Sequence, residues 1–305
     1  MNSKKVNRIF LAVILLHIGV IVLLGILGPV FTLAIVPNFI ISQAIVLVPA
    51  LIGVFLSKEN LVKLAGFRKI KISSVFMIIL FTFLAMPLTT VINAVSMLFV
   101  DNTVVAISGD ILEIPFFVML LIIGILGPFS EELIFRGIIY QGYKKSGTAL
   151  QALFLSAFLF ALMHMNFNQA AYALVIGMIL VALVEATGSL WSSVLFHVIF
   201  NSQQVCVMYL YDTLLPGMGL EEMQSQITKD TILVAISGYL IIAAITTTLA
   251  GCVLAWIAKN ENREGNLRAI WTARKNKKTG QMITVPLLIA IVLAISYMCL
   301  DFIFY

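Results

Sequence analysis

Five ionisable side chains interrupt the apolar segments of one stretch of this sequence. Glu131, Glu132 and Arg136 follow the run FFVMLLIIGIL and precede GIIY, while His164 and His197 lie in two later apolar runs. Ionisable side chains at membrane depth are costly, and those that are retained pair with one another or serve a function. The sequence therefore predicts a buried polar site built by at least three segments.

Helical spacing groups these side chains further. Glu132 and Arg136 are four residues apart, so on a helix they share a face and can form an ion pair. His197 and Asn201 are also four apart, which directs an imidazole and an amide into the same cavity. The alternative for Glu132 and Arg136 alone is a buried pair that only locks the bundle. That alternative leaves the histidines and Asn201 unexplained.

The depths of these residues are compatible with a single cavity. Counting about 1.5 Å per residue, Glu131 lies about 20 Å and His197 about 12 Å from the chain turns on the basic side. A helix kink at Pro128 would close that difference. Phe160 precedes His164 by one helical turn and would support its imidazole.

A carboxylate, two imidazoles and an amide are the groups that peptide hydrolysis requires. Glutamate and histidine can activate water directly as general base and acid. Two histidines and a glutamate are also a ligand set of catalytic zinc, so a divalent metal, zinc first, and a metal-free reaction both remain open. His197 and Asn201 suit stabilisation of an oxyanion. The motif HExxH is absent, so the chain is not a zincin.

The elements that must position these groups are membrane-spanning helices. Of the 305 residues 11% are charged, and the mean hydropathy of +1.09 excludes an ordinary soluble domain. The predicted fold is all-α: a polytopic transmembrane bundle of about nine spans (eight or nine), with a catalytic core of four helices. The segments are 9–35, 37–56, 73–100, 114–143, 148–165, 169–186, 189–210, 230–258 and 282–304. Of these, 169–186 is the least secure span.

The charge distribution predicts a cytoplasmic N-terminus. With that orientation, all 19 lysines and arginines except Lys229 and Arg136 fall on the inner side. The acidic residues predicted on the outer side are Asp101, Asp110, Asp212, Glu221 and Glu222. We expect an integral membrane protein with an uncleaved first span and a basic loop at 259–280. Because the basic residues lie in short connections, nucleic acid is not expected as a partner.

Three motifs in order resemble those of a known family. They are EExxxR at Glu131–Arg136, FxxxH from Phe160 to His164, and HxxxN from His197 to Asn201, the last preceded by a TGSLW turn. The chain resembles, over roughly 115–205, the CPBP intramembrane proteases. This CAAX-protease and bacteriocin-processing (Abi) family includes the type II CAAX prenyl endopeptidases.

The resemblance implies an intramembrane endopeptidase. Glu131 with His164 would activate the hydrolytic water, and His197 and Asn201 would line the oxyanion side. The substrate would be a peptide or protein, with lipidated and membrane-inserted chains among the candidates. A non-catalytic scaffold or bacteriocin-immunity protein of the same fold is the first alternative, and a transporter or proton relay is the second.

The resemblance also implies supporting roles. Glu132 and Arg136 would organise the site from behind the reacting groups, together with Phe160. If a metal is present, Glu131, His164 and His197 are its candidate ligands.

The position of the three motifs divides the chain into three regions. They are N-terminal helices at 1–113, the catalytic core at 114–210, and C-terminal helices at 211–305. We expect His17 to be a satisfied structural histidine and Cys206, Cys252 and Cys299 to be small buried hydrophobic residues, and the oligomeric state is left open.

Overall fold

The described residues form helices and no strands. In this computed structural model the described ranges are 1–28, 33–215, 219, 227–272 and 280–304. Among the residues singled out above, Glu221 and Glu222 lie outside these ranges, as does part of the basic loop.

Within the described residues, eight helices are long and apolar enough to cross a membrane, which confirms the predicted all-α polytopic bundle. The long elements are α1 (Ser3–Leu27), α2 (Ile35–Leu56), α4 (Ile72–Ser96), α11 (Phe167–Thr187), α12 (Leu190–Leu214), α14 (Lys229–Asn260) and α16 (Val285–Phe304). The eighth is a composite of α7 (Phe116–Met119), η1 (Leu120–Leu126), α8 (Gly127–Glu132), η2 (Leu133–Tyr140) and α9 (Gln141–Lys144). The shorter elements are α3 (Leu61–Ala65), α5 (Thr103–Ala106), α6 (Ser108–Leu112), α10 (Ala149–Met163) and α15 (Glu264–Thr272).

The least secure span was wrongly identified from the sequence. The segment predicted at 169–186 is α11, a helix of 21 residues that is long and apolar enough to span a membrane. The segment predicted at 148–165 is α10, which has 15 residues and rises about 22 Å, less than a bilayer core of about 30 Å. The chain turns back at Met165, which adopts a φ of 57°. The end of α10 therefore lies inside the bundle.

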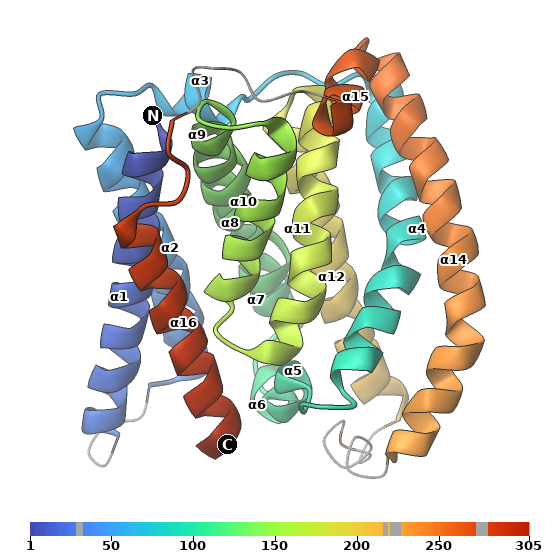
Figure 1. Ribbon diagram of the computed structural model, residues 1–305. Coiled ribbons are helices and arrows are strands. Elements are labelled where there is room, and N and C mark those ends of the chain that lie inside the picture. The colour runs from blue at the N-terminus through green and yellow to red at the C-terminus, as the bar shows by residue number, and fades with distance from the viewer. Residues whose placement is uncertain (29–32, 216–218, 220–226, 273–279, 305) are drawn as a thin grey trace.

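The two ends of the bundle differ in charge. Figure 1 shows the N-terminus, α3, α9 and α15 at one end, and α5, α6 and the C-terminus at the other. We call the first the basic end, because the lysines and arginines of these connections gather there. The second is the acidic end, with Asp101, Asp110 and Glu113 on the stretch that follows α4. The cytoplasmic orientation of the basic end remains a prediction.

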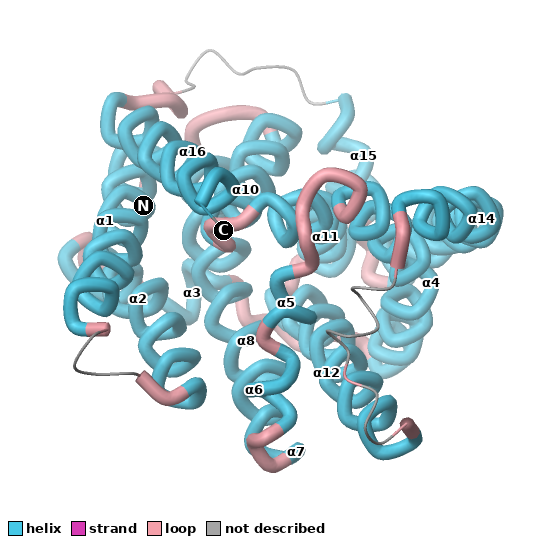
Figure 2. The backbone as a smooth tube through the Cα atoms, turned by 90° about the horizontal axis from the view of Figure 1, so that it is seen from below, coloured by secondary structure: helices cyan, strands magenta, loops and turns pink. Residues whose placement is uncertain are grey.

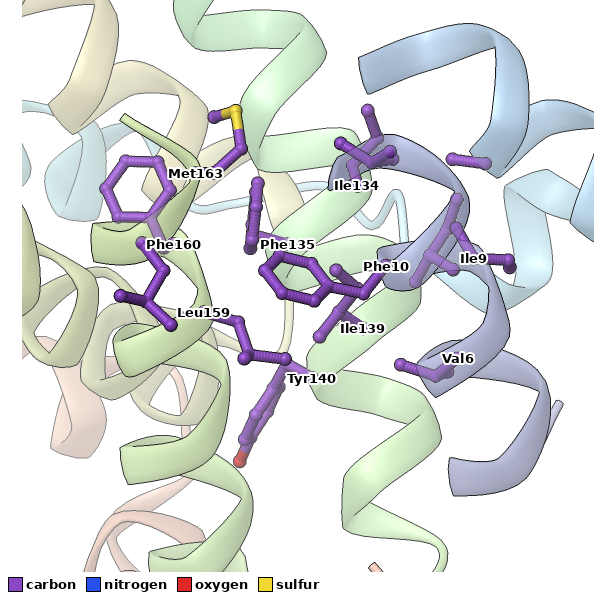
Figure 3. Close-up of a cluster of buried hydrophobic side chains, with 14 of the residues drawn as sticks. Val6, Ile9, Phe10, Ile134, Phe135, Ile139, Tyr140, Leu159, Phe160 and Met163 are labelled. Atoms are coloured by element: carbon purple, nitrogen blue, oxygen red, sulfur yellow. The ribbon is translucent and has the colours of Figure 1, made fainter. Parts of the chain in front are cut away.

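The largest hydrophobic cluster joins α1, η2 and α10. Figure 3 shows Phe10 of α1 between Phe135 and Ile139 of η2, with Leu159 of α10 on the far side. Small residues allow the closest helix contacts: a Cβ on Gly177 of α11 would lie 2.9 Å from the Cα and Cβ atoms of Ala157 in α10. This close approach holds α10 and α11 together as a hairpin, with His164 at the end of α10.

Gly177→Ala should destabilise the fold by about 1–3 kcal/mol, since the added methyl group overlaps a backbone atom of α10. Thermal unfolding in detergent measures the change. Gly251→Ala on α14 is the matched control, because a Cβ at this position would meet no atom within 4 Å and the helix favours alanine. Equal unfolding temperatures for the two variants would contradict the close contact.

Candidate active site

The seven predicted site residues come from three parts of the chain: the composite helix, α10 and α12. Glu131, Glu132 and Arg136 lie on α8 and η2, Phe160 and His164 at the end of α10, and His197 and Asn201 on α12. Contacts between these side chains bring all three parts together.

One oxygen of Glu132 is the meeting point of two of these parts. Its Oε1 accepts a hydrogen bond of 2.7 Å from Nη1 of Arg136, which confirms the predicted ion pair. The same oxygen lies 2.9 Å from Nδ1 of His197. Since a carboxylate accepts, this bond places a proton on Nδ1 of His197 and leaves Nε2 with a lone pair in the neutral ring.

His164 is oriented in the same way by a different acceptor. Its Nδ1 lies 2.9 Å from the carbonyl oxygen of Phe160, and a carbonyl cannot donate. The proton of a neutral His164 therefore sits on Nδ1, and Nε2 carries the lone pair. Both histidines thus present an unprotonated Nε2, which can accept a proton or a hydrogen bond from water.

The ring of Phe160 contacts the three groups around it. It meets His164 with the ring centroids 4.9 Å apart and His197 at 5.9 Å, both nearly perpendicular. The Cζ atom of Arg136 lies 4.2 Å from the centroid of the same ring. Phe160 therefore supports His164, as predicted, and also covers the guanidinium by a cation–π contact.

Burial separates the supporting pair from the reacting face. The side chains of Glu132 and Arg136 are 0% and 1% exposed, whereas that of Glu131 is 14% exposed. Oε2 of Glu131 lies 3.9 Å from Nε2 of His197. The accessible carboxylate is therefore Glu131, and it lies beside one of the two free imidazole nitrogens.

Two polar atoms of the buried pair have no protein partner among the described residues. They are Oε2 of Glu132 and Nη2 of Arg136. Unpaired buried polar atoms of this kind are where internal water binds, because each would otherwise cost about 1–3 kcal/mol. These two atoms are therefore the candidates for hydrogen bonds with internal water behind the reacting face.

Pro128 shapes the helix that carries the glutamates. The sequence predicts a kink there, and the structure instead has π-helical segments on both sides, η1 before and η2 after. Proline lacks an amide hydrogen, so carbonyls of the preceding turn lose their helical donor. Asn201 donates to the carbonyl of Ile123 at 3.3 Å, and Ser202 donates to that of Gly124 at 3.3 Å. Side chains of α12 thus replace the missing donor.

Ser202 is a site residue that the sequence analysis missed. A Cβ on Gly124 would lie 2.7 Å from Oγ of Ser202, so glycine is what permits this approach of η1 to α12. The sequence signal that could have indicated Ser202 is Pro128, because its missing amide hydrogen leaves carbonyls of the preceding turn in need of side-chain donors. The oxyanion role of Asn201 remains a prediction, and one of its amide hydrogens is already engaged with η1.

Glu185 is a second buried carboxylate that the sequence analysis did not single out. It is 3% exposed and accepts a 3.0 Å hydrogen bond from the hydroxyl of Tyr140. Lys144 also pairs with it, at the basic end of the same composite helix. Because both partners satisfy it, Glu185 joins α11 to α9 and η2. His17, expected to be a satisfied structural histidine, has a buried Nδ1 without a partner among the described residues. The three cysteines were predicted to be buried, and this prediction is wrong, because all three are exposed on the helices that carry them.

The candidate metal ligands do not form a coordinating group in this conformation. Among the described residues, no three or more His, Cys, Asp and Glu side chains are gathered so that they could hold a metal ion. Nδ1 of both histidines is committed to other acceptors, which leaves their Nε2 atoms with Glu131 as the donor set a metal would have to use. Metal dependence stays a prediction.

A family model matches the segment that contains this whole site. Residues 113–203 match the family described as type II CAAX prenyl endopeptidase Rce1-like. The resemblance predicted from the three motifs is thereby confirmed over this segment, which is similar to a family of membrane endopeptidases. An endopeptidase family implies a peptide substrate. The apolar helices imply a lipid environment for the chain. No curated protein and no solved structure matches the chain.

Arg136→Met should cost about 3–5 kcal/mol of unfolding free energy, because it leaves the carboxylate of Glu132 buried without its cation. Thermal or denaturant unfolding in detergent measures this change. The double variant Glu132→Gln/Arg136→Met removes both charges and should recover much of the loss. A double variant as unstable as the single one would mean that the ion pair does not account for the destabilisation.

Proposed function

We propose that this protein is an intramembrane endopeptidase that hydrolyses a peptide bond with water activated by Glu131 and His164. The observation that carries the proposal is the shared orientation of the two imidazoles. Both are fixed through Nδ1, so both leave Nε2 free, and Nε2 of His197 lies 3.9 Å from Oε2 of Glu131, the accessible glutamate of the pair.

The chemistry follows from the protons assigned to these groups. Water donates a hydrogen bond to Nε2 of His164, and the carboxylate of Glu131 accepts the proton that water releases. The water oxygen adds to the carbonyl carbon of the substrate. The tetrahedral intermediate then breaks its carbon–nitrogen bond, and Glu131 returns the proton to the departing amine. Each proton and bond is accounted for by groups of this chain.

To donate to the oxyanion, Nε2 of His197 first takes a proton from bulk water, and it returns that proton after the amine departs. Its hydrogen bond to Glu132 stabilises that imidazolium, as a buried carboxylate does for histidine in other hydrolases. Asn201 has a second amide hydrogen beyond the one it gives to Ile123, and this hydrogen is available to the same oxygen. Glu132 and Arg136 act as positioning residues.

The surroundings of the proposed enzyme follow from charge and hydropathy. A cytoplasmic basic end in a bacterial plasma membrane agrees with the positive-inside rule. The substrate is then a peptide or protein that reaches the site from the membrane or its surface, with lipidated chains among the candidates. If zinc binds, it would supply Lewis-acid activation of water, and no step above depends on it.

Glu131→Gln should lower the turnover rate at least about 100-fold while leaving the fold intact, because the amide cannot accept the proton of water. Cleavage of a quenched peptide library by purified protein, in detergent and in bilayers, measures the rate. Asp301→Asn on α16 is the matched control, and each protein is assayed with and without a chelator.

Cleavage by the wild type and the control but not by Glu131→Gln would support the endopeptidase. Loss of activity with chelator would add a metal to the mechanism. Equal cleavage by Glu131→Gln would refute the role of this carboxylate. A wild type without activity on any peptide in bilayers would favour the scaffold alternative.

A further inference from the structure

A groove opens at the acidic end of the bundle, beside the start of α2. It has a volume of about 600 Å³. Its apolar lining includes Ile35 and Phe39 from α2 and Ile107 and Ile114 from the segment around α6. Figure 2 shows α2 and α6 as seen from this end, and α2 packs against α8.

One wall of the groove, formed by α2, continues toward Glu131. Phe39 lines the groove, and Gln43 lies one helical turn further along α2. Gln43 pairs with the hydroxyl of Ser130, the residue before Glu131. The groove is therefore linked to the residue before Glu131 through one helical turn of α2 and the contact between Gln43 and Ser130.

The opposite wall leads to the oxyanion side. Ile114 lines the groove and packs in one hydrophobic cluster with Ile123. The carbonyl of Ile123 accepts a hydrogen bond from Asn201. Both walls of the groove thus continue to neighbours of the proposed site, because Ser130 precedes Glu131 and Ile123 accepts from Asn201.

The site is closed in the other direction. Every residue of η2, from Leu133 to Tyr140, is buried, and this segment runs from the glutamates toward the basic end. The Glu132–Arg136 pair fills the space directly behind Glu131. Access from the basic end along this helix would require these side chains to move, whereas the groove already opens at the acidic end.

The rim of the groove is negatively charged. Asp110 and Glu113 belong to its lining, and both residues are exposed. Elsewhere in the described part of this end, Asp101 and Asp212 add further negative charge, while Lys229 is the basic residue there. A concave surface with one sign of charge attracts segments of the opposite sign.

We propose that this groove admits the substrate, a peptide segment that carries basic residues next to apolar ones and arrives from the acidic end. The apolar side chains would lie on Ile35, Phe39 and Ile114, and the basic ones at Asp110 and Glu113. The inference rests on the proposed function for the cleavage step, whereas binding to the groove is independent of turnover.

The test compares Asp110→Lys/Glu113→Lys with the wild type on two matched peptides. In one, lysines precede a leucine–alanine stretch, and in the other glutamates replace the lysines. The double variant should raise KM for the lysine peptide roughly threefold to tenfold without changing kcat, and it should lower KM for the glutamate peptide. The differences should shrink at high salt, which a folding defect would not cause.

Asp101→Lys/Asp212→Lys is the control, because it makes the same charge change at the same end outside the groove. An equal rise of KM in the control, or an unchanged KM in the groove variant, would overturn the proposal.

Binding separates this proposal from the proposed function. Fluorescent forms of the two peptides are titrated onto the Glu131→Gln protein with and without the groove substitutions. If the wild type cleaves nothing but the groove variant weakens lysine-peptide binding threefold or more, the groove stands and the endopeptidase fails. If cleavage occurs but neither KM nor binding changes, the groove fails and the endopeptidase stands.

Discussion

The arrangement depends on one carboxylate oxygen, Oε1 of Glu132, which receives both Arg136 and His197. A glutamate that is fully buried in an apolar bundle needs a cation and hydrogen bonds to remain ionised. Arg136 supplies the charge from the same helix, and His197 supplies a hydrogen bond from α12. In return, the carboxylate fixes the proton of His197 on Nδ1. A single desolvated group therefore holds two helices together and sets the chemistry of an imidazole.

The rest of the fold meets the geometric demands of that group. The hairpin of α10 and α11 turns back inside the bundle, which brings His164 to the depth of the glutamates. Phe160 then contacts both imidazoles and covers Arg136. Asn201 and Ser202 of α12 replace the donor that is missing at Pro128. The helix that Pro128 interrupts is thereby bonded to α12, which carries His197.

Local patterns were predictable, and contacts distant in sequence were not. Hydropathy predicted the bundle, and four-residue spacing predicted the Glu132–Arg136 pair, because both depend on neighbours along one helix. The bond from His197 to Glu132 joins residues 65 apart, which no periodicity reports. Segment length gave the wrong prediction that α10 spans the membrane, because an apolar segment that ends inside a bundle has the same sequence pattern as a short span. The groove at the acidic end arises from α2 and α6 together, and neither segment carries a motif.

The most direct test of this account is the protonation of the histidine rings. With three histidines in the chain, nitrogen-15 NMR of histidine-labelled protein is tractable, and the variants His17→Gln, His164→Gln and His197→Gln assign the signals. The account predicts that His164 and His197 both carry the proton on Nδ1 and a lone pair on Nε2 in the resting protein. A proton on Nε2 of His197 would contradict it, because Glu132 would then not set the state of that ring.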